Sequence, residues 1–331
     1  MPDSLSALEA RLTSAWADKA ALHAECGAAR LLNASASGTP RLVFELYGKH
    51  GILYDYGDSE KSDGNAGETS RGIRLRAAAS SWKERFGWES ISLVDRASAG
   101  DAARSGSFAL AGEPPESLTI LENGQPFRLE LRHPRNVGLF LDTRELRREL
   151  RANSQGARVL NLFCYTGSLG LAALLGGAAE VVQVDVSARY LAWGRENLAL
   201  AKLAEDRCRF VKMDSERYLD WASKKGLRFD RILLDPPVFS RFDGKVFRFE
   251  SDYFRLAAKA AALLAPGGAL VAVTNYFGIS YAEFASGLGE AAHRAGISGP
   301  IRPIALPPDF EVANPDLRPE GNALIACLEA R

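Results

Sequence analysis

The sequence predicts an α/β protein in which a mostly parallel sheet with an antiparallel C-terminal edge follows a smaller α+β domain. From residue 158 on, short apolar runs alternate with helical stretches, and each parallel crossover needs a helix to return the chain. The last two apolar runs, 301–306 and 322–329, have no helix between them, so they should pair antiparallel. The 331 residues also exceed the roughly 250 to 300 residues of a single core, which favours two domains.

The first part of the chain mixes helical and strand patterns. Apolar residues recur at helical spacing at Leu5, Leu8, Leu12, Trp16 and Leu22. Two β-like runs, 42–47 and 51–56, follow this predicted helix. Segments 57–71 and 97–116 are rich in Gly, Ser, Asp and Glu, so we expect solvated loops. We place the domain boundary after the second loop, which gives domains 1–116 and 117–331.

The second domain should open with a hairpin. Residues 118–122 and 127–131 flank Asn123-Gly124, a pair that accepts the positive φ angles of a tight primed turn. A helix is predicted over 143–153. The predicted strands of the parallel sheet are 158–163, 180–186, 208–213, 229–235 and 269–275. The predicted helices are 168–176, 187–203, 215–225, 251–265 and 281–295.

The composition argues against several classes of protein. Lys plus Arg and Asp plus Glu number 41 each, so bulk charge would not hold the chain on DNA or an anionic membrane. Residues 1–134 hold 15 basic and 18 acidic side chains and residues 135–331 hold 26 and 23, which leaves room for a local basic surface. The four Cys and four His lack the spacing of a disulfide framework or a metal site. With no signal peptide and no apolar run near ~18 residues, we expect a cytoplasmic protein without a membrane span.

In an open parallel sheet the ligand binds beyond the carboxyl ends of the strands, so the turns there are the candidate site. The first strand leads into a tight turn, Cys164 to Gly167, which lacks the G-x-G-x-x-G fingerprint of pyrophosphate binding. The second strand ends at Asp185, near the spacing of about 20 residues at which a carboxylate binds ribose hydroxyls. Either feature alone is equally typical of a structural turn.

The third and fourth turns add polar groups. Asp214 and Ser215 could bind an exocyclic amine, and Asp214 could equally cap the next helix. In the fourth turn, Pro236 and Pro237 fix φ and remove two donors, so the carbonyls become fixed acceptors beside Asp235. With the flat ring of Phe239, this turn could hold a planar nitrogenous base. The structural alternative is that the prolines only end the strand rigidly.

Five motifs, taken together, resemble those of the class I S-adenosylmethionine-dependent methyltransferases of large-subunit ribosomal RNA. Within these enzymes the chain is most similar to the guanine-N7 branch and its cytosine-C5 cousins, from about residue 28 to the end. The motifs are Gly138 to Arg144 (G-x-F-L-D-x-R), Asn161 to Gly167 (N-L-F-x-Y-T-G), Asp185 with Ser187, Asp214 with Ser215, and Asp235 to Ser240 (D-P-P-x-F-S). The resemblance implies a Rossmann-like class I methyltransferase sheet with S-adenosyl-L-methionine as its cofactor.

The resemblance also implies site residues. The residues expected to bind the cofactor are Phe140, Asp142, Asn161, Phe163, Tyr165, Thr166, Gly167, Asp185, Ser187, Asp214, Ser215 and Asp235. The residues expected to act on the target base are Asp235, Pro236, Pro237 and Phe239. No metal is implied.

The chain departs from the cytosine-C5 branch, which carries a nucleophilic cysteine after the next strand. Here that turn reads Val273-Thr274-Asn275-Tyr276. Methylation of carbon 5 needs a thiolate that adds to the ring, whereas nitrogen 7 of guanine already has an in-plane lone pair. We therefore favour a nitrogen acceptor, either this atom or an exocyclic amine.

Two segments are candidates for RNA contacts. Residues 240–254 interleave Arg and Lys with aromatic residues, a mixture suited equally to phosphate contacts with base stacking and to core packing. The second candidate is a basic cluster at helical spacing, more typical of a solvated helix face, formed by Arg144, Arg147, Arg148 and Arg151.

The sequence thus predicts a cytoplasmic S-adenosylmethionine-dependent methyltransferase that acts on RNA, with a guanine of large-subunit ribosomal RNA as its target. The N-terminal domain would help to present the RNA. One alternative is a methyltransferase of a small molecule or a protein. Another is a non-catalytic RNA-binding factor that kept the fold. The modified atom, the form of the RNA substrate and the oligomeric state are left open at this stage.

Overall fold

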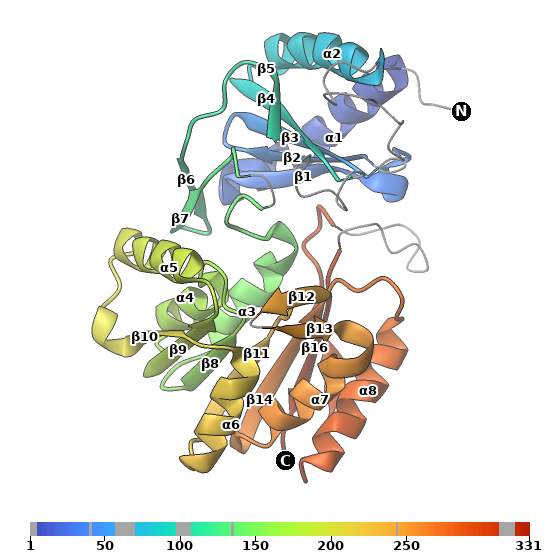
Figure 1. Ribbon diagram of the computed structural model, residues 1–331. Helices are drawn as coiled ribbons and strands as arrows, with labels where there is room; N and C mark the ends of the chain where they lie inside the picture. Colours follow the sequence, from blue (N-terminus) through green and yellow to red (C-terminus); the bar gives the residue numbers. More distant parts are fainter. Residues whose placement is uncertain are drawn as a thin grey trace. The chain divides into compact units, whose positions relative to one another are not determined.

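The computed structural model describes residues 5–39, 42–56, 70–96, 107–133, 136–242, 244–310 and 322–331 (Figure 1). Contacts between residues divide the chain into two compact units. The first comprises Met1–Leu141 and Pro308–Glu320, and the second comprises Asp142–Pro307 and Gly321–Arg331. The chain therefore passes from the second unit into the first and back again near its C-terminus.

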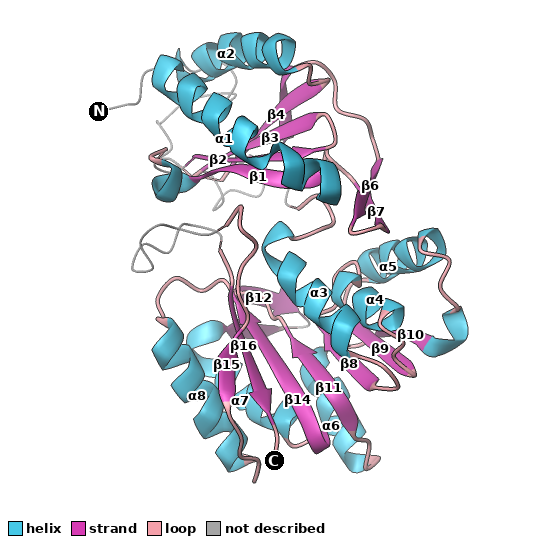
Figure 2. Cartoon of the chain, turned by 180° about the vertical axis from the view of Figure 1, so that it is seen from behind, coloured by secondary structure: helices cyan, strands magenta, loops and turns pink. Residues whose placement is uncertain are grey.

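The first unit is a five-stranded sheet packed against two helices that lie next to each other (Figure 2). The strand order is β1-β2-β3-β4-β5, with β3 and β4 parallel and the other neighbours antiparallel. The elements are α1 (Leu5–Cys26), β1 (Ala28–Asn33), η1 (Ala34–Ser37), β2 (Leu42–Tyr47), β3 (His50–Asp55), α2 (Ser70–Phe86), β4 (Ser90–Asp95) and β5 (Ser107–Ala111).

Four elements of this unit, β1, α2, β4 and β5, were not predicted. Strand β1 is buried at all six positions, so it lacks the polar alternation that marks a half-buried strand. Helix α2 buries Leu75, Ala79 and Trp82 at helical spacing among many charged residues, a signal that the composition obscured. The expected loop 97–116 is wrong at β5. Of the expected loop 57–71, residues 57–69 lie outside the described residues and residues 70–71 begin α2.

A buried ion pair lies within this sheet. Arg30 on β1 donates to Glu45 on β2 through Nε (3.0 Å) and Nη2 (2.7 Å), and Tyr47 donates to the other carboxylate oxygen (2.7 Å). The backbone N–H of Arg30 donates to Asp309 at 2.8 Å, and the guanidinium lies 4.0 Å from the ring centroid of Phe310. The segment that returns to the first unit is therefore bound to the same charged group that joins β1 to β2.

The predicted hairpin is confirmed as β6 (Leu118–Glu122) and β7 (Gln125–Leu129). Both turn residues are left-handed, Asn123 at φ +50° and Gly124 at φ +77°, as a primed turn requires. This hairpin belongs to the first unit, so the boundary that we expected at residue 116 precedes the division at Leu141.

The second unit is a seven-stranded sheet in the order β10-β9-β8-β11-β14-β16-β15. Its first five strands are parallel, and β16 pairs antiparallel with both β14 and β15, which confirms the predicted antiparallel edge. The strands are β8 (Arg158–Leu162), β9 (Glu180–Asp185), β10 (Cys208–Lys212), β11 (Phe229–Leu234), β14 (Leu264–Thr274), β15 (Ile301–Pro303) and β16 (Leu324–Glu329). The helices are α3 (Arg144–Asn153), α4 (Ser168–Leu175), α5 (Ala188–Leu200), α6 (Ser215–Lys224), α7 (Phe249–Ala261) and α8 (Tyr281–Arg294), with short turns η3 (Leu141–Thr143) and η4 (Glu205–Arg207).

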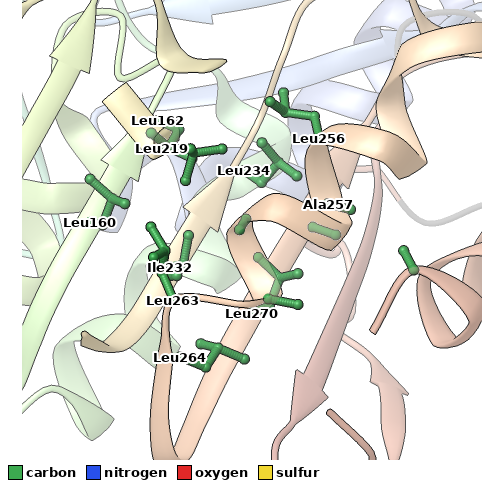
Figure 3. Packing of buried hydrophobic residues seen from close by; sticks show 14 of the residues in the cluster. Leu160, Leu162, Leu219, Ile232, Leu234, Leu256, Ala257, Leu263, Leu264 and Leu270 are labelled. Carbon is green, nitrogen blue, oxygen red and sulfur yellow. The ribbon is translucent and has the colours of Figure 1, made fainter. Parts of the chain in front are cut away.

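Alternate strand residues enter two separate cores on the two faces of this sheet. Leu160, Leu162, Ile232 and Leu234 pack with side chains of α6, α7 and α8, in the core drawn in Figure 3. Val159, Val181 and Leu233 pack with α3, α4 and α5 on the other face. Burial on both faces explains why the strands read as continuous apolar runs.

Two expectations for the second unit are corrected. Arg144 and Arg147 of α3 are buried, at 0% and 3% exposure, whereas Arg148 and Arg151 are exposed, so only half of the basic cluster lies on a solvated face. Arg147 donates to Thr143 at 2.7 Å, so part of this helix face serves packing and hydrogen bonding. Residues Phe239–Phe242 (β12) and Lys245–Arg248 (β13) form a separate antiparallel hairpin that was not predicted.

Across the described part of the chain, no helix is both long enough and apolar enough to cross a membrane.

Replacing Glu45 by Ala should destabilise the first unit by about 3 to 5 kcal/mol, because it leaves the buried guanidinium of Arg30 without its carboxylate. Urea unfolding would measure the loss, and hydrogen exchange over β1 and β2 would assign it to this unit. Glu290→Ala is the control, because its pair with Arg294 is exposed and should change stability by less than about 0.5 kcal/mol. Equal effects of the two substitutions would contradict the role given to the buried pair.

Candidate active site

The turn after β8 is held in an unusual backbone conformation. Phe163 and Tyr165 have φ angles of +55° and +52°, and Gly167 has +80°. Non-glycine residues rarely adopt positive φ, and they concentrate where a binding site requires them. Gly167 precedes α4 without a side-chain cap, so the first backbone N–H groups of this helix have no side-chain acceptor from the N-cap residue.

Buried amides hold this turn from below. Asn161 on β8 donates to Gln183 on β9 at 2.7 Å, and Gln183 in turn donates to the carbonyl of Gly167 at 3.1 Å. Asn197 of α5 donates to the carbonyl of Thr166 at 3.2 Å. Asn161 is therefore a support of the turn, not a group on its surface.

Sequence reasoning missed Gln183 and Asn197. The signal was present, because Gln183 interrupts the apolar run of β9 and Asn197 falls on the buried side of α5. Gln183 also limits its neighbours: a Cβ on Gly167 or Gly170 would lie 2.8 or 2.5 Å from its Nε2 atom. The positive φ of Gly167 favours glycine there, and a side chain at either position would require the Gln183 amide to shift.

Asp185 lies at the end of β9 with both carboxylate oxygens in use. Oδ2 accepts from the backbone N–H of Tyr165 at 3.0 Å, and Oδ1 accepts from that of Ser187 at 2.8 Å. Burial raises the pKa of Asp185, while these backbone donors oppose the rise. An ionised carboxylate has about four acceptor sites, so Asp185 can still accept a hydrogen bond from a ligand.

Two of the residues predicted to bind the cofactor, Asp214 and Ser187, are also helix caps. Asp214 accepts from the backbone N–H of Arg217 at 3.0 Å and caps α6. This was one of the two roles predicted for it. Ser187 caps α5 through the N–H of Tyr190. Ser215 is buried and accepts from the N–H of Phe163 at 3.3 Å, which ties the α6 turn to the β8 turn.

Asp235 follows β11 and faces an unfavourable electrostatic environment. Burial, together with the carboxylate of Asp142, raises the pKa of Asp235 to about 7. Asp142 is itself buried, at 8% exposure. A carboxyl group whose pKa is raised by a second carboxyl favours a cation or a hydrogen-bond donor beside it.

Tyr253 of α7 supports this turn from inside the core. Its side chain is fully buried, and its hydroxyl donates to the carbonyl of Val273 at 2.9 Å, with the carbonyl of Leu234 at 3.4 Å. Burial and the nearby Asp235 raise the pKa of Tyr253 well above its usual range. The phenol therefore stays protonated and joins the ends of β11 and β14.

Beyond Asp235, Pro236 is buried and Pro237 is exposed. Phe239 opens β12 with 49% of its surface exposed, so its ring is available to a planar ligand. Of the predicted site residues, Phe140 belongs to the first unit and all others belong to the second. Those of the second unit lie at the carboxyl ends of β8, β9, β10 and β11 or on η3, apart from Asn161 below the first turn.

The residues present fit a nucleoside cofactor with a positively charged group. Asp185 offers acceptor sites to hydroxyls, and the carboxyls of Asp142 and Asp235 favour positive charge. A pyrophosphate would fit poorly, because negative charge would be repelled by these two acids.

Comparison with known proteins agrees with this arrangement. A family model described as S-adenosylmethionine-dependent methyltransferase matches residues 70–324. The ribosomal RNA large subunit methyltransferase K/L of Chromohalobacter salexigens is 43% identical over 176 residues, which are 52% of this chain and 24% of that protein. YwbD of Bacillus subtilis, assigned as a ribosomal RNA large subunit methyltransferase, is 36% identical over 222 residues, 66% of this chain and 54% of that protein. The chain thus spans about a quarter to about half of the length of these relatives.

The fold also has similar solved structures. SMU.776, assigned as a methyltransferase and complexed with SAH, has a TM-score of 0.82 at 23% identity, covering 99% of this chain and 82% of that one. The M. jannaschii tRNA m1G37 methyltransferase has a TM-score of 0.53 at 14% identity, covering 92% of this chain and 76% of that one. These likenesses confirm the predicted class of fold, a mostly parallel methyltransferase sheet with an α+β region before it.

Replacing Gln183 by Leu should weaken S-adenosylmethionine binding by about tenfold and destabilise the protein by about 1 to 3 kcal/mol. The substitution removes the donor to Gly167 and leaves the amide of Asn161 without its acceptor. Calorimetry with the cofactor would measure the change. Asn153→Ala removes an exposed amide of α3 and serves as the control; unchanged affinity in the Gln183 variant would contradict the supporting role.

Replacing Asp235 by Asn should stabilise the protein relative to wild type, increasingly from about pH 4 to pH 7. The folded-state pKa of about 7 exceeds the unfolded value of ~3.9, so in this window the wild-type free energy of unfolding falls as pH rises. The difference should level off above pH 7 at up to about 4 kcal/mol.

Thermal and urea unfolding across this pH range would measure the difference. Asp142→Asn removes the second cause of the raised pKa of Asp235, so it should narrow the pH range over which the difference in stability changes. A difference between Asp235→Asn and wild type that stays constant with pH would rule out the raised pKa.

Proposed function

Because this chain belongs to the S-adenosylmethionine-dependent methyltransferase family, we propose that it methylates a base nitrogen, with guanine as the favoured base, in large-subunit ribosomal RNA. The two curated relatives described above carry the name of ribosomal RNA large subunit methyltransferases, which supports this class of substrate. The observation that carries the proposal is the turn of Asp235, Pro236 and Pro237, where a carboxyl with a pKa of about 7 precedes two residues without N–H donors.

We assign the cofactor to the turns after β8, β9, β10 and β11, together with η3. S-adenosylmethionine, when bound, supplies a methyl group on a positively charged sulfonium. Asp185 would accept hydrogens from ribose hydroxyls through the lone pairs that Tyr165 and Ser187 leave free. The carboxyls of Asp142 and Asp235 would favour the positive charge of the cofactor. The proposed contacts come from Phe140, Asp142, Phe163, Tyr165, Thr166, Gly167, Asp185, Ser187, Asp214, Ser215 and Asp235, with Asn161 supporting the turn.

The target base would lie against the turn after β11. The Asp235 carboxylate and the carbonyls beside Pro236 and Pro237 would accept hydrogens from the ring N1–H and the 2-amino group of a guanine, on the edge opposite N7, and Phe239 would cover its face. These contacts orient the base for in-line transfer, and orientation alone can contribute about 7 to 11 kcal/mol.

A nitrogen acceptor fits this chain better than a carbon acceptor. Methylation at carbon 5 of cytosine requires a reactive thiolate, and the turn after β14 offers Thr274 and Asn275 instead of a cysteine. Cys164 is buried, and burial raises the pKa of its thiol well above the usual range. Nitrogen 7 of guanine needs no thiolate. For an exocyclic amine, the second candidate, Asp235 could accept the released proton.

We assign the presentation of the RNA to the N-terminal domain, expected over residues 1–116, and catalysis to the domain expected over 117–331. We also infer that the protein acts in the cytoplasm. All four cysteines are free and buried, which agrees with a reducing compartment.

Purified protein should transfer a labelled methyl group from S-adenosylmethionine to ribosomal RNA, offered free or in large-subunit particles. Mass spectrometry of ribosomal RNA nucleosides from cells with and without the gene should reveal one missing methylated nucleoside in the latter. Asp185→Ala should weaken cofactor binding at least tenfold, because a paired hydroxyl-binding carboxylate is lost.

Parallel incubations with protein-only extract and with metabolite extract separate the two other candidate substrate classes. Label in either extract, with none in RNA, would overturn the assignment to ribosomal RNA. Cofactor binding without label in any fraction would favour the non-catalytic RNA-binding factor.

A further inference from the structure

The β12–β13 hairpin that follows the target-base turn has two chemically different faces. Its register pairs Phe239 with Arg248 and Ser240 with Phe247. Side chains alternate along a strand, and directly paired residues share a face. One face therefore carries Ser240 and Phe247, and the other carries Phe239, Arg241, Val246 and Arg248.

The first of these faces is tied to the cofactor turn. The ring of Phe247 lies 6.2 Å from that of Phe163, and it packs on the edge of the sheet core. The backbone N–H of Phe249 donates to the carbonyl of Val238 at 3.0 Å, which closes the base of the hairpin. The hairpin is thus anchored on one side, and its other side is the one that a ligand can reach.

The outer face combines apolar surface with cations. Phe239 is 49% exposed and Val246 is 44% exposed. The guanidinium carbons of Arg241 and Arg248 lie 5.5 and 5.8 Å from the ring centroid of Phe239. An exposed aromatic ring with two guanidinium groups near it is an arrangement suited to binding stacked bases and phosphates.

Arg241 and Arg248 are both exposed, and no carboxylate of a described residue pairs with them. Neither guanidinium forms an ion pair within the described part of the chain, although neighbouring cations such as Arg255 and Lys259 do. The two described acids that follow Arg248 in the sequence are engaged elsewhere. Asp252 accepts from the backbone N–H of Arg248 and pairs with Arg255, and Glu250 accepts from the hydroxyl of Tyr276. Among the described residues, the two positive charges on this face therefore have no ion-pair partner.

We propose that the outer face of β12–β13 binds the phosphodiester backbone of unpaired RNA next to the target nucleotide, with Arg241 and Arg248 as phosphate ligands. This inference rests on the proposed function. A base that reaches the Asp235 turn must leave its stack, and this is easiest in single-stranded RNA. The face that follows this turn directly in the chain offers apolar surface and positive charge, which match such a segment better than a folded protein surface.

The test uses the full chain and a fluorescent single-stranded RNA oligonucleotide of mixed sequence. Arg241→Gln and Arg248→Gln should each weaken binding roughly tenfold and lower the slope of log affinity against log salt by about 0.7, the value for one phosphate on a single strand. Arg228→Gln removes an exposed arginine before β11, at the opposite end of the strand, and should change neither quantity. Calorimetry with S-adenosylmethionine verifies that each variant is folded.

Wild-type affinity and slope in both arginine variants would overturn the inference, even if ribosomal RNA is still methylated. Equal binding of the same sequence as a duplex would overturn the assignment to unpaired RNA. The converse result, an arginine-dependent slope with no methyl transfer to any RNA, would support this binding face and refute the proposed function.

Discussion

The site depends on a chain of buried amide hydrogen bonds from Asn161 through Gln183 to the carbonyl of Gly167. Burying these amides is favourable only because each finds a partner, and the partners belong to three different segments. These hydrogen bonds join β8 to β9 and hold the conformation of the turn between β8 and α4. The positive φ angles of Phe163 and Tyr165 are maintained by this support and by the bond from Tyr165 to Asp185.

A second constraint is electrostatic. Asp142 comes from the turn before α3 and Asp235 from the end of β11, and together with burial they bring the pKa of Asp235 to about 7. When Asp235 is ionised, this arrangement lowers the stability of the folded protein. Proteins retain such destabilising groups where function needs them. The hydroxyl of Tyr253 lies next to this turn and joins the carbonyls at the ends of β11 and β14.

The first unit is organised by its own buried charge. Arg30 joins β1 to β2 through Glu45, and its N–H group holds Asp309 of the segment that enters from the other end of the chain. Through this hydrogen bond the first unit depends on Asp309, which lies 279 positions from Arg30 in the sequence. The first unit therefore combines two stretches of sequence, Met1–Leu141 and Pro308–Glu320.

The sequence by itself determined the parallel sheet, its antiparallel edge, the Asn123-Gly124 hairpin and the order of the site-bearing turns. These features follow from local periodicity and turn chemistry, which act over a few residues. Only the tertiary structure decided that Arg144 and Arg147 are buried, that Asn161 supports the turn through Gln183, and that β12 and β13 divide a basic aromatic segment into an anchored face and an exposed one. These outcomes depend on which distant segments pack together, and burial of a polar side chain is set by partners that no local pattern contains.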